Sequence, residues 1–157
     1  MSEPPRPIPA GWVPFIRLLM KWFGALNVLV YRLSRGRLMG TFPGGSPICL
    51  VTMTGAKSGK RRVTPLIYVA HGDAVILVAS QGGMEKNPLW YHNLKAHPDI
   101  EINFRGNVRT LRARQVSPEE KQRLWPIAVA VYAPFQEYQD RTKRDIPVFL
   151  CEPLPPR

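Results

Sequence analysis

The sequence feature that most constrains the fold is the stretch from residue 48 to 65, where two apolar, β-branched-rich runs flank a turn that contains glycine. Apolar runs joined in this way predict a β-hairpin. Gly55 and Gly59 permit positive φ and let a ligand approach the backbone closely. The hairpin tip also carries four cationic side chains, at Lys57, Lys60, Arg61 and Arg62. We expect the tip to hold an anion, although a solvated turn that is basic by chance would have the same composition.

The tip does not match a nucleotide-phosphate loop. That motif places four residues between its first glycine and a Gly-Lys-Ser or Gly-Lys-Thr sequence that opens a helix. Here only three residues separate Gly55 from Gly59, and Lys60 is followed by Arg61 and strand-like residues. The spacing and the context therefore exclude this motif.

The net charge of +11 is distributed unevenly along the chain. Residues 4–72 contain ten Lys or Arg and no acidic residue, whereas residues 73–157 contain twelve Lys or Arg and ten acids. One electropositive region is therefore expected, and it would suit nucleic acid, an anionic membrane or a polyanionic small molecule. Nucleic acid is disfavoured, because the basic residues lie on an apolar helix and one short tip and not on an extended face with exposed aromatics.

A chain of 157 residues is most simply one domain with its own core. Cys49 and Cys151 each lie in an apolar run, far apart in the sequence, which favours two buried thiols of a cytosolic protein. The three histidines have no ligand-type spacing with cysteines or carboxylates. We therefore expect no metal site.

The first 33 residues differ from the rest of the chain. Five prolines in residues 1–14 predict a loose arm, and residues 15–33 have helical periodicity. The second segment is about long enough to cross a bilayer, but Arg17, Lys21 and Gly24 argue against a span, and no small-residue cleavage site supports a signal peptide. An amphipathic helix remains, lying either on an anionic membrane or on the protein's own core or a partner.

The remaining chain, residues 34–157, reads as a barrel domain. Strands are expected over residues 48–54, 62–70, 74–80, 100–104, 108–116 and 147–151, and helices over 88–96, 117–132 and 135–142. Asn87 is expected to cap the first of these helices, with Pro88 at its first position. About six mostly antiparallel strands without regular strand–helix alternation predict an α+β, mainly β protein, an antiparallel barrel with peripheral helices.

The sequence contains no self-sufficient catalytic machinery, because no nucleophile elbow, cysteine–histidine pair or carboxylate pair is recognisable. An enzyme of this kind would leave the difficult chemistry to a bound cofactor. Polar residues that could line its site group at the basic tip, at residues 80–83 and at residues 86–93. Tyr132, Phe135 and Tyr138 are spaced by three and could share one face. Core packing would also explain each aromatic residue.

Several motifs in one order resemble those of a known family. They are Thr54–Gly59 with Arg62–Leu66, then Ala79–Gly83 with Lys86–Leu94, and finally Asp145–Pro147 with Cys151–Pro153. Together they resemble the deazaflavin-dependent nitroreductase family, which consists of actinobacterial split β-barrel proteins that use the reduced coenzyme F420. The resemblance covers roughly residues 25–153 and implies a split β-barrel that binds this coenzyme.

The resemblance also implies site residues. Those implied to bind the coenzyme are Lys57, Ser58 and Arg62 at its phosphate and oligoglutamate tail, and Val63, Thr64, Pro65, Val78, Ala79, Ser80, Gln81, Leu89, Trp90, Tyr91 and Asn93 around its ring. Those implied to take part in catalysis are Tyr132, Tyr138 and Ser80. Where the best-known nitro-reducing member has a third tyrosine this chain has Phe135, and Gln81 stands where relatives often have lysine.

The main hypothesis is an oxidoreductase that uses reduced F420 to transfer hydride to a quinone-like or nitroaromatic acceptor. We expect this protein in the cytoplasm, at the inner face of the cell membrane. By analogy with other split barrels, we also expect two chains to form a homodimer. The alternative is a non-catalytic protein that binds the deazaflavin or a lipid.

Overall fold

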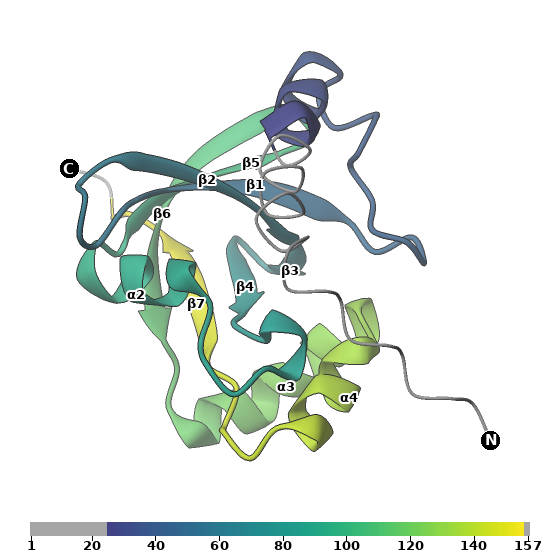
Figure 1. Cartoon of the computed structure of the whole chain (residues 1–157), viewed down its shortest axis with the longest axis vertical. Coiled ribbons are helices and arrows are strands. Elements are labelled where there is room, and N and C mark those ends of the chain that lie inside the picture. The colour runs from purple at the N-terminus through teal and green to yellow at the C-terminus, as the bar shows by residue number, and fades with distance from the viewer. Residues whose placement is uncertain (1–24, 156–157) are drawn as a thin grey trace, which may run out of the picture.

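The computed structural model describes residues 25–155, so the expected loose arm and the first part of the expected amphipathic helix lie outside the described residues. The strands form one sheet that curls into a half-barrel (Figure 1). They are β1 (Ile48–Thr54), β2 (Arg61–Ile67), β3 (Val69–His71), β4 (Ala74–Val78), β5 (Asp99–Phe104), β6 (Asn107–Gln115) and β7 (Val148–Pro153). Their order is β2-β1-β5-β6-β7-β4-β3, and every pairing is antiparallel. The expected mainly β split barrel with peripheral helices is confirmed.

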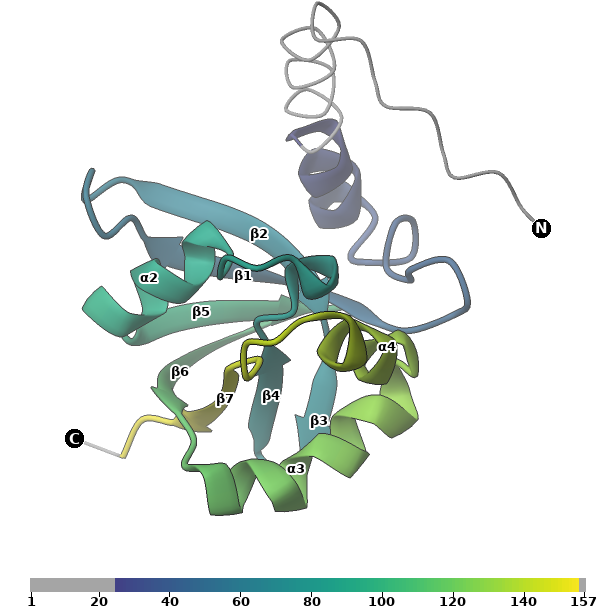
Figure 2. The same ribbon diagram turned by 60° about the horizontal axis from the view of Figure 1, so that its bottom comes forward.

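Helices lie around this sheet. They are a segment over residues 25–33, the short 3-10 turn η2 (Gln81–Gly83), α2 (Leu89–Ala96), α3 (Pro118–Val131) and α4 (Pro134–Arg141). The segment over residues 25–33 and helix α3 lie at opposite ends of the molecule (Figure 2). α3 ends before Pro134, and α4 begins at Pro134, one residue before the start expected for the last helix, because proline fits the first helical turn. No helix within residues 25–155 has the length and hydropathy that a bilayer span requires.

The strand expected over residues 62–70 is in fact two strands at opposite edges of the sheet. β2 ends at Ile67 and pairs with β1, whereas β3 begins at Val69 and pairs with β4. Between them, the Tyr68 N–H donates to the Pro47 carbonyl at 2.8 Å. Among the described strands, β2 pairs only with β1, and this edge position tolerates Pro65, which has no N–H to donate. Residues 25–155 therefore contain seven strands, where about six were expected.

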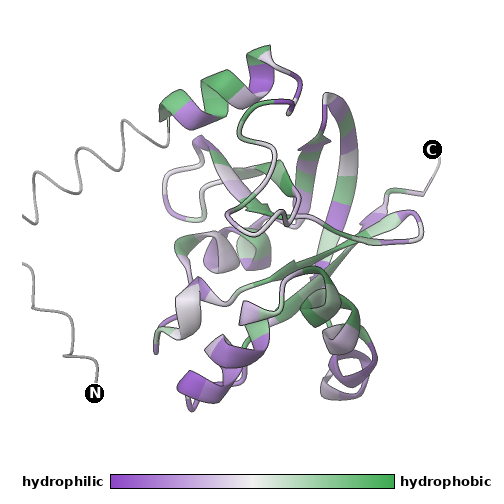
Figure 3. Ribbon diagram, turned by 90° about the vertical axis from the view of Figure 1, so that its right-hand side faces the viewer, coloured by the Kyte–Doolittle hydropathy of each residue, from purple (hydrophilic) through white to green (hydrophobic). Residues whose placement is uncertain are grey.

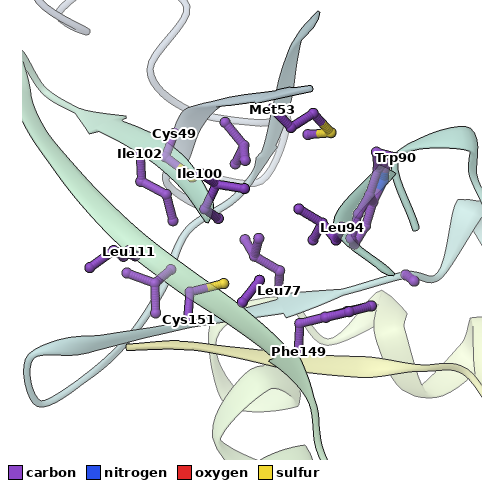
Figure 4. Close-up of a cluster of buried hydrophobic side chains, with 14 residues drawn as sticks. Cys49, Met53, Leu77, Trp90, Leu94, Ile100, Ile102, Leu111, Phe149 and Cys151 are labelled. Atoms are coloured by element: carbon purple, nitrogen blue, oxygen red, sulfur yellow. The ribbon is translucent and has the colours of Figure 1, made fainter. Parts of the chain in front are cut away.

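Two hydrophobic cores lie on opposite faces of β4 and β7. All five residues of β4 are buried, as expected for a strand covered on both sides. Alternate side chains point to opposite faces, so Val75 and Leu77 join the core inside the curled sheet, whereas Ile76 joins the core against α3 and α4. Figure 4 shows the inner core, with Trp90 and Leu94 of α2 beside Leu77.

Tyr31 anchors the helical segment over residues 25–33 to the barrel. Its side chain is fully buried, and its hydroxyl donates to the carbonyls of Ile48 (2.9 Å) and Asn103 (3.3 Å). The same oxygen accepts from the Arg105 N–H at 3.1 Å. Burial, the largest cause, raises the pKa of Tyr31 above its ordinary value. The last turns of this helix therefore pack on the barrel, and the domain boundary proposed at residue 33 stays a prediction.

We predict that Tyr31→Phe lowers the free energy of unfolding by about 1–3 kcal/mol, because buried backbone groups on β1 and β5 lose their partner. Urea denaturation monitored by circular dichroism would measure this loss. Tyr68→Phe is the control, since its half-buried hydroxyl accepts only a long 3.5 Å bond from Arg109. Equal stability of the wild type and Tyr31→Phe would contradict the anchoring role.

Candidate functional site

Two neighbouring pockets bring together most of the residues that the sequence indicated. The first, which we call the cationic pocket, has a volume of about 940 Å³. It lies between the β1–β2 tip and helix α2, which adjoin in Figure 1. Its lining is Gly55, Ala56, Lys57, Ser58, Arg62, Val63, Thr64, Gln81, Pro88, Leu89, Trp90, His92 and Asn93. No carboxylate from the described part of the chain is in this lining, so the pocket suits an anion.

The tip is a tightly hydrogen-bonded turn. The Gly55 N–H donates to the Lys60 carbonyl at 2.8 Å, and the Gly59 N–H donates to the Gly55 carbonyl at 2.9 Å. Ser58 Oγ accepts from the Lys60 N–H at 3.2 Å. A Cβ at residue 55 would lie 2.6 Å from this oxygen, so a larger residue there would displace the Ser58 hydroxyl from the turn. Gly59 has a φ of +64°, a conformation that other residues rarely adopt.

The cations of the tip have different roles. Arg61 forms a salt bridge with Glu101 of β5, so this side chain is directed away from the pocket. Lys57 and Arg62 line the pocket and form no salt bridge with any residue in the range 25–155. The two arginines are consecutive in β2, where neighbouring side chains point to opposite faces. Of the four cations at the tip, Lys57 and Arg62 are therefore in the pocket lining, whereas Lys60 and Arg61 are not.

Helix α2 forms the opposite wall and is joined directly to the tip. Asn93 Oδ1 accepts from the Ala56 N–H at 2.9 Å. Leu89 is 85% exposed at the pocket, whereas Trp90 is buried and packs against Phe149 with ring centroids 6.0 Å apart. The helix thus holds the tip on one side and the inner core on the other.

The start of α2 differs from the expectation. Pro88, and not Asn87, is the N-cap residue, and the helix begins at Leu89. Asn87 Oδ1 accepts instead from Arg144 Nη1 at 2.8 Å. Pro88 has an extended backbone with a ψ of 155°, so the helix starts one residue later than the pattern of residues suggested.

The second pocket, which we call the aromatic pocket, has a volume of about 660 Å³. Its lining is Asn27, Met39, Thr41, Phe42, Pro43, Ile48, Pro65, Leu66, Ile67, Val78, Ser80, Gly82, Tyr132, Phe135 and Tyr138. No charged side chain of the described residues is among them. The pocket is therefore suited to a flat, neutral, largely apolar molecule.

The three late aromatic residues do lie on one side of this pocket. The Tyr132 and Phe135 rings meet edge to face with centroids 4.9 Å apart, and the Tyr132 and Tyr138 hydroxyls are 3.1 Å apart. Phe42 meets Tyr132 edge to face at 5.7 Å. Burial, followed by the hydrogen bond with Tyr138, raises the pKa of Tyr132 to about 12. This hydroxyl therefore carries its proton at neutral pH.

Consecutive residues divide the two pockets. Thr64 lines the cationic pocket and Pro65 the aromatic one, and Gln81 lines the former between Ser80 and Gly82 of the latter. The backbone at this turn is unusual, since Gln81 has a φ of +44° although it is not glycine. Gly83 lies so close to α4 that an added Cβ would be 2.7 Å from the Tyr138 carbonyl oxygen. The turn over residues 80–83 is thus the common wall.

The structure places the predicted residues as follows. Those at the cationic pocket are Lys57, Ser58, Arg62, Val63, Thr64, Gln81, Leu89, Trp90 and Asn93. Those at the aromatic pocket are Pro65, Val78, Ser80, Tyr132 and Tyr138. Two predicted residues line neither pocket: the Ala79 side chain lies in the inner core, and the Tyr91 ring packs edge-on against Phe149 at 5.7 Å. The Tyr91 hydroxyl donates to Gln115 at 3.4 Å.

Some lining residues were missed by sequence reasoning. His92 belongs to a segment that was singled out, but it was not chosen as a site residue. Asn27, Met39 and Phe42 come from the helix and the loop before β1, and no local pattern marks them. Only their contacts with distant residues, such as Phe42 with Tyr132, bring them to the pocket.

The two cysteines are buried free thiols, as expected. Burial raises the pKa of Cys49 to about 12 and also raises that of Cys151. Both belong to the inner core, away from the pocket linings. No group of three or more metal-ligating side chains gathers within residues 25–155.

Comparison with known proteins decides the family. The family model described as F420H(2)-dependent quinone reductase matches residues 23–153. The chain belongs to this family. An F420H(2)-dependent quinone reductase of Mycobacterium tuberculosis strain H37Rv is 43% identical over 126 residues, which cover 78% of this chain and 85% of the relative.

Solved structures agree with this quinone reductase family. A structure described as an F420-H2 dependent reductase is 45% identical, with a TM-score of 0.64, and the match covers 68% of this chain and 94% of that one. Another, described as a domain-swapped dimer, is 37% identical with a TM-score of 0.66, and the match covers 85% and 98% of the respective chains.

Proposed function

We propose that this chain is an oxidoreductase that binds reduced coenzyme F420 in the cationic pocket and reduces a quinone-like acceptor in the aromatic pocket. The observation that carries the assignment is the common wall between a pocket lined by cations and one without charge. A cofactor with an anionic end and a planar end fits the first pocket, and a lipophilic acceptor fits the second. Membership of the F420H(2)-dependent quinone reductase family supports this arrangement.

The residues of the cationic pocket fit the coenzyme. Lys57, Ser58 and Arg62 would hold its phosphate and its oligoglutamate tail, because cations and a hydroxyl donate to anionic oxygens. Glycine at residue 55 keeps the turn tight beside them. The exposed Leu89 side chain offers apolar surface to a planar ring, and Thr64 and Gln81 border the aromatic pocket. When bound, the reduced coenzyme supplies a hydride, which is two electrons and a proton.

Tyr132 and Tyr138 would act on the acceptor. A quinone that takes up a hydride also needs one proton to become a hydroquinone. The Tyr132 Oη, protonated at neutral pH and hydrogen-bonded to Tyr138, can donate to an oxygen of the acceptor and then be reprotonated from solvent through Tyr138. Phe135, which is buried beside them, offers no third hydroxyl. We infer a preference for quinones over nitroaromatic acceptors.

We predict that Arg62→Ala and Lys57→Ala each weaken coenzyme binding by about 1–3 kcal/mol, with a smaller loss at high salt, because a charge-assisted contact is removed. Fluorescence titration with oxidised F420 would measure the dissociation constants. Arg61→Ala is a matched control, since the neighbouring side chain pairs with Glu101 across the sheet. The affinity of Arg61→Ala for F420 should change by less than about threefold, because this variant loses only an exposed ion pair, and such pairs contribute little free energy. Equal losses for all three variants would contradict the assignment of the tip.

We predict that Tyr132→Phe lowers kcat for menadione reduction by about tenfold or more, since a general acid is lost while the ring remains. Stopped-flow oxidation of reduced F420 would measure the rate. Tyr68→Phe serves as the control, because this tyrosine stacks on Phe104 at 3.8 Å and lines neither pocket. An unchanged kcat with a raised KM would assign the hydroxyl to acceptor binding alone.

We also propose that the region before β1 contacts an anionic membrane. Leu33 and Leu38 are 78% and 62% exposed, and Leu26 and Leu29 are exposed on the same helical segment. Figure 3 shows hydrophobic residues interleaved with hydrophilic ones on this segment. Arg32, Arg35 and Arg37 supply cations for lipid headgroups. Asn27 and Met39 of this region also line the aromatic pocket, so a lipophilic acceptor could pass from membrane to pocket over a short path.

We predict that a Leu33→Asp, Leu38→Asp double variant partitions at least about tenfold less into vesicles that contain phosphatidylserine, because apolar insertion is lost. Vesicle co-sedimentation would measure this. Met84→Asp, at an exposed apolar residue of another loop, is the control. Substitution is preferable to deletion of residues 1–33, because deletion would also remove the anchor Tyr31. Unchanged partitioning of the double variant would refute this contact surface.

We propose, finally, that two chains pair in solution. The support is a 37% identical structure that is described as a domain-swapped dimer. Sedimentation velocity would test the pairing, and a single monomeric species at micromolar concentration would refute it.

A further inference from the structure

Arg144 makes an unusual set of contacts behind the two pockets. It lies between α4 and β7, and its side chain reaches four residues of one segment. Nε donates to the Met84 carbonyl at 2.7 Å, and Nη1 donates to Asn87 Oδ1 at 2.8 Å. Nη2 donates to the carbonyls of Ala79 (3.1 Å) and Ser80 (2.8 Å). One guanidinium therefore ties together both ends of the segment over residues 79–87.

All four acceptors are neutral, and no carboxylate within residues 25–155 forms a salt bridge with Arg144. By contrast, Arg112 and Arg114 form ion pairs at the surface, with Asp99 and Glu120 respectively. A guanidinium that is partly buried without a counter-ion is costly unless its N–H groups are satisfied. The geometry of its planar fork, and not charge neutralisation, therefore accounts for this residue.

The tied segment contains the common wall of the pockets. Ser80 and Gly82 line the aromatic pocket, and Gln81 and, just after the segment, Pro88 line the cationic pocket. Left-handed backbone at Gln81 costs free energy and persists only where neighbouring contacts hold it. Three of the four acceptors of Arg144 flank this turn directly, at residues 79, 80 and 84.

Arg144 is itself held in place from the opposite side. Gln139 Nε2 donates to the Arg144 carbonyl at 2.8 Å, and Gln139 Oε1 accepts from the Ile146 N–H at 2.9 Å and from Lys121 Nζ at 3.1 Å. The backbone from which the guanidinium extends is therefore held by Gln139 of α4, which is itself bonded to Lys121 of α3.

We propose that Arg144 is a positioning residue, which fixes the wall between the pockets and so sets the alignment of coenzyme ring and acceptor. The expected effect on kcat rests on the proposed function. The expected ordering of the wall by Arg144 does not depend on it. Arg144 lines neither pocket, so it would act on the coenzyme and the acceptor only through the wall. A misplacement of the wall would spoil alignment while the phosphate and tail contacts at the tip remain.

The test uses Arg144→Lys, which keeps the charge but cannot reach four acceptors with one ammonium group. We expect kcat to fall about 10- to 100-fold, since small misplacements are this costly, while the dissociation constant for F420 changes by less than about threefold. In the protein without coenzyme, we expect hydrogen–deuterium exchange of the amides in residues 80–89 to be about tenfold faster. Exchange in β1 and β5 should be unchanged.

Arg114→Lys is the matched control, because Arg114 also makes several hydrogen bonds but contacts Glu120 and Glu152, away from both pockets. It should lower stability without changing kcat or exchange in residues 80–89. Wild-type kcat and wild-type exchange in Arg144→Lys, assayed below its melting temperature, would overturn the proposal. So would an equal loss of kcat and coenzyme affinity.

Asn87→Ala keeps the test decisive if Arg144 variants fail to fold, since it removes only the Nη1 contact. It should accelerate exchange in residues 80–89 in the same direction, and unchanged exchange there would overturn the proposal. If the wild type neither binds F420 nor oxidises its reduced form, the proposed function fails. The exchange measurements on Arg144→Lys would still decide whether this residue orders the wall.

Discussion

The attachment of helix α2 to the curled sheet is the constraint on which the rest of the site depends. Trp90 and Leu94 fill the inner core, and this burial holds the helix without fixing its orientation closely. The hydrogen bond from the Ala56 N–H to Asn93 Oδ1, at 2.9 Å, fixes the orientation of the helix relative to the tip, because hydrogen bonds are directional. Nonpolar burial and one directional contact together make the cationic pocket a fixed cleft between two walls.

Features that depend on neighbouring residues could be predicted from the sequence, and features that depend on distant contacts could not. The hairpin tip follows from two glycines between β-branched runs, and the start of α3 follows from Ser117, which caps the helix by accepting a hydrogen bond from the Glu120 N–H at 3.2 Å. The division of the second strand at Tyr68 depends on the pairing of β3 with β4 at the far edge of the sheet. The pairing of Arg61 with Glu101 depends on β5 lying beside β1.

The same distinction applies within the candidate site. Spacing by three indicated that Tyr132, Phe135 and Tyr138 share a face, and they do, although α3 ends before Tyr132 and α4 begins at Pro134. It was harder to predict which side chains at the end of β4 face a pocket. Ala79 points into the inner core while Ser80 reaches the aromatic pocket, because the chain leaves the sheet there. The assignment of Asn87 as a helix cap was wrong, because its hydrogen-bond partner is Arg144, which lies 57 residues away in the sequence and could not be recognised from neighbouring residues.

The arrangement of charge explains why an anionic cofactor would bind in one direction only. In the later part of the chain, Arg112, Arg114 and Lys121 are paired with acids, so their charge is largely compensated locally. Lys57 and Arg62 also form no salt bridge among the described residues, and both line the cationic pocket, whereas the adjoining aromatic pocket is uncharged. The anionic end of the proposed coenzyme would be attracted to the tip, and moving it toward Tyr132 would remove it from both cations without any compensating charge. In the proposed arrangement, electrostatic attraction would therefore select the end of the coenzyme that enters the cationic pocket, and the wall over residues 80–83 would separate its planar end from the acceptor.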